Sequence, residues 1–141
     1  MKKKGNLSKA IKYANKLGYE VNFKANIIDY VDFEKKVIKI TTRQKEREQV
    51  YCILHELGHV VLSKNKRSYK KKYQYHTFHK RSKKYLITEI EEEIHAWKVG
   101  EEIAKKIGIK IDRKAYNECS NSSIMTYIDY ASKNKKKYSK L

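Results

Sequence analysis

The sequence predicts an α+β fold in a single domain, residues 1–141, in which several helices accompany a small antiparallel sheet. The length of 141 residues suits one hydrophobic core and leaves little room for a second. Hydrophobic residues make up 40% of the chain, which is enough to form that core despite the many charges. The spacing of apolar residues changes from helical to alternating and back to helical, so both kinds of element are expected.

The first half of the chain contains a helix, a group of strands and a second helix, in that order. Apolar residues recur at steps of three and four between Leu7 and Leu17, and Gly18 follows as a helix stop. Residues 19–42 are rich in Val, Ile, Phe and Tyr and end in an alternating pattern, which predicts two or three antiparallel strands. Residues 44–63 return to helical spacing with many apolar side chains, so this helix should be largely buried.

The second half begins with a strongly basic segment. Residues 64–85, here called the basic loop, carry ten positive charges and no acidic residue. We expect an irregular loop that packs partly on the rest of the protein through its tyrosines. A helix is expected at 87–107, followed by a helical region that starts at Asp112 and breaks near 121–123. The last residues, 133–141, are expected to form a solvated basic tail.

The helix at 44–63 carries the motif HELGH, which indicates metal chemistry. His55 and His59 are four residues apart, so their imidazoles share one helix face and can bind the same ion. Catalytic zinc takes three protein ligands and a water, and Glu56 between the histidines would be the base for that water. The pattern arises by chance about 0.015 times per chain of this composition, so we interpret it as a site for one Zn²⁺ rather than two core histidines. Gly58 would let another backbone or a substrate approach closely.

The third ligand has to come from elsewhere in the chain. One source is the helix at 87–107, which has several carboxylates and one histidine, although most of its acidic residues should be ordinary surface charges. The other source is the basic loop, which has two histidines. The candidates from these two segments are Glu89, Glu92, Glu93, His95, His76 and His79. The residues alone leave these possibilities open.

HELGH follows an Ile- and Thr-rich strand and precedes, by about thirty residues, a helix of the form E-x-x-A. This arrangement, from Val37 to Ala104, resembles the ImmA/IrrE group of gluzincin-type metallopeptidases, which phages and mobile elements commonly carry. In that family the later helix typically reads E-x-E-A-N and its first Glu binds zinc, so the resemblance implies Glu93 as the third ligand. His95 stands where the family has an acidic residue and Trp97 where it has Asn. The alternatives for a ligand or an outer-shell group are Glu89, Glu92 and His95.

The resemblance also implies a fold and a mechanism. The fold is a minimal zincin-like domain, with helices packed on the small antiparallel sheet and the HExxH helix buried at its centre. The activity is a zinc metallo-endopeptidase that cleaves a protein substrate, such as a DNA-binding repressor of a phage or mobile element. His55, His59 and Glu93 would hold the zinc, and Glu56 would take the proton of the attacking water. Donors to the oxyanion or substrate are expected among Tyr75, His76 and His79.

Two other functions remain open at this stage. One is a DNA-associated, SprT-like zinc protease with a histidine third ligand, and the other is a catalytically silent zincin-fold binding module, such as an anti-repressor or toxin. The net charge of +18, concentrated in the basic loop and tail, allows non-specific contact with nucleic acid. No apolar run suits a membrane span or a signal peptide, and Cys52 and Cys119 are too few for a disulfide framework. We therefore expect a cytoplasmic protein with no membrane partner.

Overall fold

The computed structural model describes residues 5–80 and 82–138, with the backbone alone for 134–138. Its helices are α1 (Asn6–Lys16), α2 (Glu46–Ser63), α3 (Lys66–Tyr73), the 3-10 helix η1 (Tyr75–Thr77), α4 (Lys83–Ile107) and α5 (Arg113–Tyr138), and its strands are β1 (Glu20–Lys24), β2 (Tyr30–Asp32) and β3 (Val37–Thr41). The described part of the chain is therefore a mixed α+β structure, as the sequence predicts.

The small sheet has the strand order β1-β3-β2, so β3 lies in the middle. β2 and β3 are antiparallel and form a hairpin through residues 33–36, where Lys36 has a φ of 54°. The expected antiparallel arrangement is wrong for the other pair, because β1 runs parallel to β3, with Glu20 opposite Val37. Alternating apolar residues indicate which face of a strand is buried, and they do not indicate the direction of its neighbour.

The hydrophobic core forms where α2 meets its neighbours. This helix contacts α1, α4 and α5 as well as strands β2 and β3. Ile38 and Ile40 alternate on the buried face of β3, and Ile53, Leu54 and Leu57 of α2 are completely buried. The helix that carries HELGH is thus apolar on nearly every side for most of its length, which is why its sequence lacks a strong polar face.

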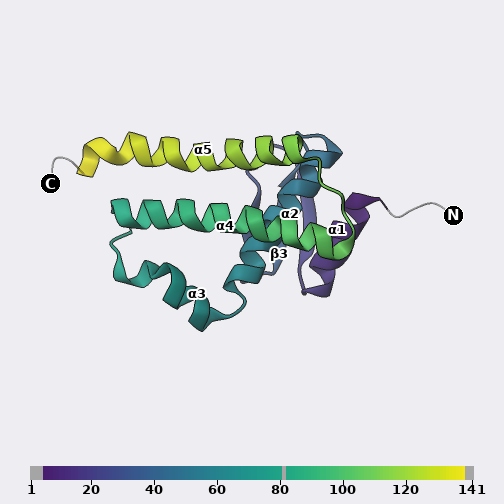
Figure 1. Cartoon of the computed structure of the whole chain (residues 1–141), viewed down its shortest axis with the longest axis horizontal. Helices are drawn as coiled ribbons and strands as arrows, with labels where there is room; N and C mark the ends of the chain where they lie inside the picture. The colour runs from purple at the N-terminus through teal and green to yellow at the C-terminus, as the bar shows by residue number, and fades with distance from the viewer. Residues whose placement is uncertain (1–4, 81, 139–141) are drawn as a thin grey trace.

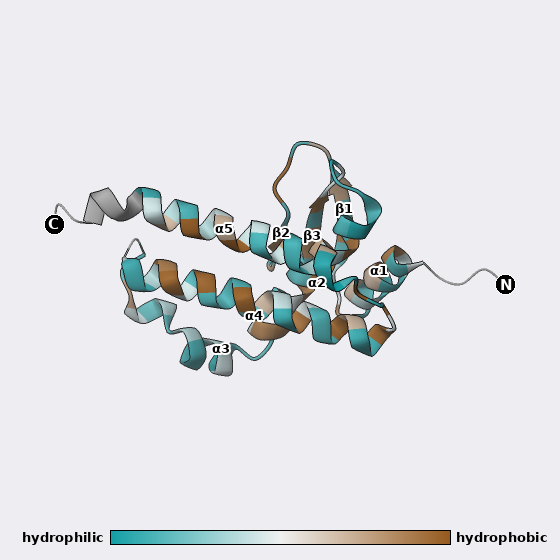
Figure 2. Cartoon of the chain, turned by 45° about the horizontal axis from the view of Figure 1, so that its top comes forward, coloured by the Kyte–Doolittle hydropathy of each residue, from teal (hydrophilic) through white to brown (hydrophobic). Residues whose placement is uncertain are grey.

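α4 and α5 extend side by side well past the sheet (Figure 1). Hydrophobic and hydrophilic bands alternate along both helices, as expected of helices that bury only one face (Figure 2). The exposed apolar side chains on this part of the protein are Ile87, Met125, Ile128 and Tyr130. No helix of the described residues combines the length and apolar character that a membrane span requires.

The basic loop is more ordered than expected. Residues 66–73 form α3, which begins at Asn65, whose side chain accepts a hydrogen bond from the Ser68 amide at 3.1 Å. The helix ends at Gln74, which has a left-handed φ of 54°, and η1 follows. Tyr73 is buried at the end of α3, so the tyrosines hold this segment against α4 as a helix rather than as an irregular loop.

The break expected near residues 121–123 is also wrong, because α5 continues through it. Ser120 and Thr126 donate their hydroxyl hydrogens to carbonyls of the preceding turn at 3.1 Å, so these polar residues satisfy themselves within the helix. Ile124 packs against the core and keeps the helix in place. The expected basic tail at 133–141 begins inside α5, and residues 139–141 lie outside the described part of the chain.

Candidate metal centre

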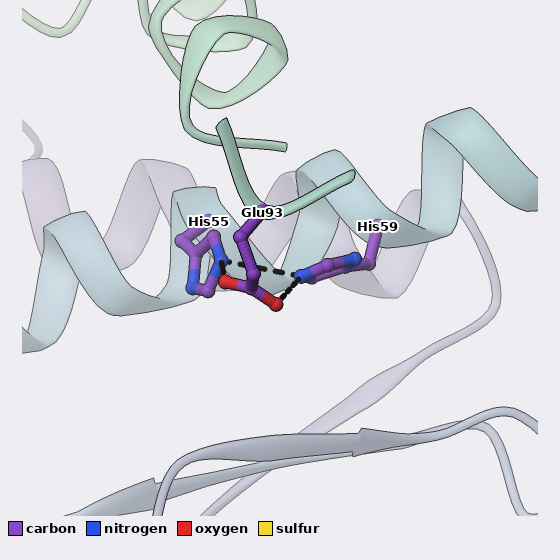
Figure 3. A group of neighbouring side chains, drawn as sticks. All are labelled: His55, His59 and Glu93. Carbon is purple, nitrogen blue, oxygen red and sulfur yellow. Dashed lines mark hydrogen bonds and ion pairs between the residues drawn. The ribbon is translucent and has the colours of Figure 1, made fainter. Parts of the chain in front are cut away.

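Two histidines of α2 and one glutamate of α4 converge on one point (Figure 3). The Nε2 atoms of His55 and His59 lie 2.7 and 2.8 Å from the two carboxylate oxygens of Glu93, and 3.2 Å from each other. All three side chains are buried. Their ligand atoms lie within 4.8 Å of one another, so this cluster could bind a metal ion. Two imidazoles and a carboxylate are a ligand set that divalent metals accept in proteins.

The cluster exists because α2 and α4 approach unusually closely. A Cβ atom added to Gly58 would lie 2.1 Å from the Ala96 carbonyl oxygen, and one added to Gly100 would lie 2.8 Å from the Leu54 carbonyl oxygen. Only a residue without a side chain permits such contacts between backbones. The prediction that Gly58 admits another backbone is therefore confirmed, and this contact brings Glu93, one turn before Ala96, against the histidines.

Trp97 stacks on the imidazole of His55 and fixes its orientation. The two rings are stacked, with centroids 4.3 Å apart and an angle of 7° between their planes. Trp97 is itself held in place by α5. The Tyr116 ring meets the Trp97 ring edge-on, with centroids 5.3 Å apart, and the Tyr116 hydroxyl donates to the Trp97 carbonyl. Trp97, one of the two residues that differ from the E-x-E-A-N pattern, thus orients a candidate ligand.

Glu92 holds the other histidine from behind. One of its oxygens lies 2.7 Å from Nδ1 of His59, so the Nε2 atom of that ring is turned toward Glu93. Its second oxygen accepts hydrogen bonds from the hydroxyls of Tyr75, at 3.0 Å, and of Tyr69. A carboxylate on the far nitrogen of a ligating histidine fixes the ring and its tautomer. The segment expected to be a loop therefore supports the His-His-Glu cluster through two tyrosines.

The charges of the cluster compensate one another in the absence of a metal. Burial disfavours the charged form of His59, but its hydrogen bonds to Glu92 and Glu93 raise its pKa to about 10. Burial likewise opposes ionisation of Glu93, yet the hydrogen bonds from His55 and His59 hold its pKa well below the usual range. A proton on His59 thus balances part of the negative charge that a metal ion would otherwise balance.

Glu56 is buried next to the cluster but is not part of it. Its carboxylate lies 3.5 Å from Nδ1 of His55, and it lines the same cavity as His59 and Glu93. Burial raises the pKa of Glu56, although the neighbouring histidines act in the opposite direction. A carboxylate with a raised pKa beside a metal cluster has the properties of a general base.

A cleft runs past Glu56 and His59. Its central cavity, of about 260 Å³, lies between β2, α2, α4 and α5 and also contains Tyr75, Glu89 and Tyr127. A second cavity of about 640 Å³ adjoins it on the α5 side and shares Glu56 and Tyr127 with it. The central cavity is also lined by three large aromatic side chains whose rings are partly exposed, namely Tyr30, Phe33 and Tyr127. His59 and Glu93 of the cluster therefore line a cavity at the protein surface.

The other predicted site residues fall into two groups. Glu89 lines the central cavity, where burial raises its pKa, and Tyr75 lines it while bonded to Glu92. His95 is turned toward α3, with Nδ1 2.9 Å from the Tyr73 hydroxyl, and does not join the cluster. His76 and His79 are exposed and do not line the cavities around the cluster.

Sequence reasoning missed Tyr127, Tyr69 and the stacking role of Trp97. Tyr127 lines both cavities, and burial together with the nearby Glu93 carboxylate raises the pKa of its hydroxyl. The signal was present in the spacing, because Tyr116, Ser123 and Tyr127 recur on one helix face. Continuing the final helix through 121–123 would have placed Tyr127 on the face that meets α2 and α4.

Comparison of the chain with models of known protein families, with curated proteins and with solved structures gave no match. The interpretation of the site therefore depends on its residues and their geometry.

Proposed function

We propose that the protein is a zinc-dependent metallo-endopeptidase of the zincin type, related to the ImmA/IrrE group, that cleaves a regulatory protein. The observation that supports this most is the combination of a buried His-His-Glu cluster with a buried Glu56 beside it, at the side of an open cleft. A structural metal site is normally closed by four protein ligands, whereas three ligands next to a cleft leave a position for water and substrate.

His55, His59 and Glu93 would hold the ion. Bound there, Zn²⁺ would supply Lewis-acid activation of the attacking water and of the scissile carbonyl. Glu56 would accept the proton of that water and return it to the leaving amine, because burial raises the pKa of this carboxyl and makes it a better proton acceptor than an exposed glutamate. Tyr127 would donate its hydroxyl hydrogen to the carbonyl oxygen as negative charge develops there, a role earlier expected of Tyr75, His76 or His79.

The geometry favours this function over a DNA-associated protease with three histidine ligands. Glu93 bridges both histidines of HELGH, while His95 is engaged by Tyr73 on the opposite side of α4. The substrate under this proposal is a folded or partly unfolded regulatory protein such as a DNA-binding repressor. The protein would act inside the cell, where its free thiols Cys52 and Cys119 persist.

The test compares the wild-type protein with a Glu56→Gln variant. Metal content is measured by inductively coupled plasma mass spectrometry, and cleavage of unfolded casein and of purified repressor proteins is followed by mass spectrometry of the products. We expect about one zinc per chain in both proteins and cleavage by the wild type alone. Equal cleavage by the Glu56→Gln protein would refute the assigned base, and a wild-type protein that binds no divalent metal would refute the proposed function.

A further inference from the structure

A second groove, lined by lysines, opens next to the cleft of the proposed active site. It has a volume of about 840 Å³ and lies between the end of α1, the β2–β3 turn, the end of α2 and the start of α3. Its lysines come from four different elements and are all exposed: Lys16, Lys36, Lys64 and Lys66. One carboxylate, Glu34, also lines it. No ion pair among the described residues engages these four lysines, so their charge is available to a ligand.

The lysine groove adjoins the central cavity. Phe33 lines both of them. Tyr69 lines the lysine groove while its hydroxyl binds Glu92, which in turn holds His59. Val60, the next residue after His59, also lines the groove. The lysine groove therefore lies next to the cavity that contains Glu56.

The other end of the cleft has the opposite character. The cavity of about 640 Å³ on the α5 side is lined by acidic residues, by the small polar residues of α5 and by no lysine or arginine. Its carboxylates are Asp29, Glu48, Glu56 and Glu118. The cleft is thus polarised along its length, basic on one side of the metal cluster and acidic on the other. Complementary charge selects partners and their orientation more than it increases affinity.

We propose that the lysine groove binds acidic side chains of the peptide substrate, so that the protein cleaves segments with Asp or Glu on one defined side of the scissile bond. This rests on the proposed function, whose cleft supplies the other half of the binding surface. A peptide fits better than a nucleic acid because the groove leads into an acidic cavity, which would repel a second stretch of phosphates. The apolar and aromatic lining of the groove by Leu17, Phe33 and Tyr69 suits peptide side chains as well.

The test determines where the zinc-loaded protein cuts a complex mixture of peptides prepared from a digested proteome, with all cleavage sites read by mass spectrometry. Enrichment of Asp and Glu within about four residues on one side only is expected. Two fluorogenic peptides are then compared that differ only at the enriched positions. One peptide has Asp or Glu there, and the other has Asn or Gln. Their ratio of kcat/KM is compared for the wild type, for Lys36→Glu/Lys66→Glu and for Lys110→Glu/Lys114→Glu.

The two double variants are matched. Each changes the net charge by the same amount, and each pairs a residue outside the helices with one in a first helical turn, where Glu is favourable. Lys110 and Lys114 are exposed and line none of the three cavities described. We expect the groove variant to lose the acidic preference by about tenfold and the control to keep it, with unchanged thermal unfolding in both. Equal loss in both variants would show a general effect of net charge and would overturn the proposal.

A binding measurement separates this inference from the proposed function. Binding of a fluorescein-labelled acidic peptide is measured by fluorescence anisotropy. The Glu56→Gln protein is used because it should bind the peptide without cleaving it. Tight, salt-sensitive binding that Lys36→Glu/Lys66→Glu abolishes supports the groove even where no substrate is cut. Cleavage of casein without any preference for acidic sequences leaves the peptidase intact and rejects the groove. Stronger binding of a dT20 oligonucleotide than of the acidic peptide, lost in the same variant, rejects the peptide in favour of nucleic acid.

Discussion

The contact between Gly58 and Ala96 can be tested by adding a single methyl group. In a Gly58→Ala variant the new Cβ atom would lie 2.1 Å from the Ala96 carbonyl oxygen, which is 0.9 Å short of the 3.0 Å that real Cβ contacts respect. Both partners are backbone atoms of packed helices, so no rotation of a side chain relieves the overlap. The helices α2 and α4 have to separate by nearly 1 Å at this point.

Two effects of opposite sign act on stability. Replacement of glycine by alanine in a helix interior normally stabilises by about 1 kcal/mol. Overpacking of this kind costs typically about 1–3 kcal/mol, and a clash between backbones lies at the upper end. The net loss is about 2 kcal/mol, which lowers Tm by roughly 8 °C for a chain of this size. Because ligand distances tolerate only about 0.2 Å, moving Glu93 away from His55 and His59 weakens metal binding by about tenfold or more.

The assay combines thermal unfolding of the metal-free protein, followed by circular dichroism, with zinc affinity measured by competition against a chromophoric chelator. Asn121→Ala is the control, since residue 121 is exposed in the middle of α5 and alanine favours a helix there. We expect the control to unfold at the wild-type temperature or slightly above it and to bind zinc normally. A Gly58→Ala protein that is as stable as the wild type, with unchanged zinc affinity, would refute the close approach of the two helices.

Three further predictions concern the metal cluster. Glu93→Gln should lose stoichiometric zinc while His95→Gln keeps it, as measured by mass spectrometry of metal content; the reverse result would assign the third ligand to His95. Glu92→Gln should weaken zinc binding by about 10–100-fold without removing it, because the imidazole of His59 loses its orienting carboxylate, and an unchanged chelator competition would contradict that role. Zinc binding at pH 7.5 should release about one proton, because a pKa of about 10 keeps His59 protonated without metal and a histidine ligand has to be neutral. Titration calorimetry in buffers of different ionisation enthalpy measures the number of protons released. The zinc affinity should rise with pH up to about pH 10.

The part of the site that the sequence predicts well is the part encoded by local spacing. A helical spacing of four residues places His55 and His59 on one face wherever the helix lies in space. Glu93 was selected among several carboxylates by resemblance to a known family, and the structure brings that residue to the histidines. Local spacing alone does not distinguish Glu93 from Glu89, because both lie on one helix face. The distinction comes from the contact of Gly58 with Ala96, which fixes how α4 is placed against α2.

The features that the sequence does not predict depend on contacts between distant segments. The parallel direction of β1 follows from where β3 inserts in the sheet, and no residue of either strand encodes it locally. Positive charges four residues apart in α3, such as Lys66 and Lys70, repel one another and destabilise the isolated helix. It is stabilised by Tyr73, buried against α4, and by Tyr69, bonded to Glu92. In these cases tertiary contacts outweigh the local pattern from which the expectations were drawn.

The stretch from Glu92 to Trp97 explains why the metal cluster and the surrounding helices depend on one another. Within these six residues of α4, Glu93 faces the histidines, Glu92 binds the tyrosines of α3 and η1, His95 binds Tyr73, and Trp97 contacts α5. His95 and Trp97, which differ from the E-x-E-A-N pattern of the group that the sequence resembles, are therefore the residues that attach α3 and α5 to the site. A chain with so many mutually repelling lysines gains from the attachment of α3 in particular, because Tyr69 brings this basic helix against the Glu92 carboxylate of α4 and so offsets part of the self-repulsion.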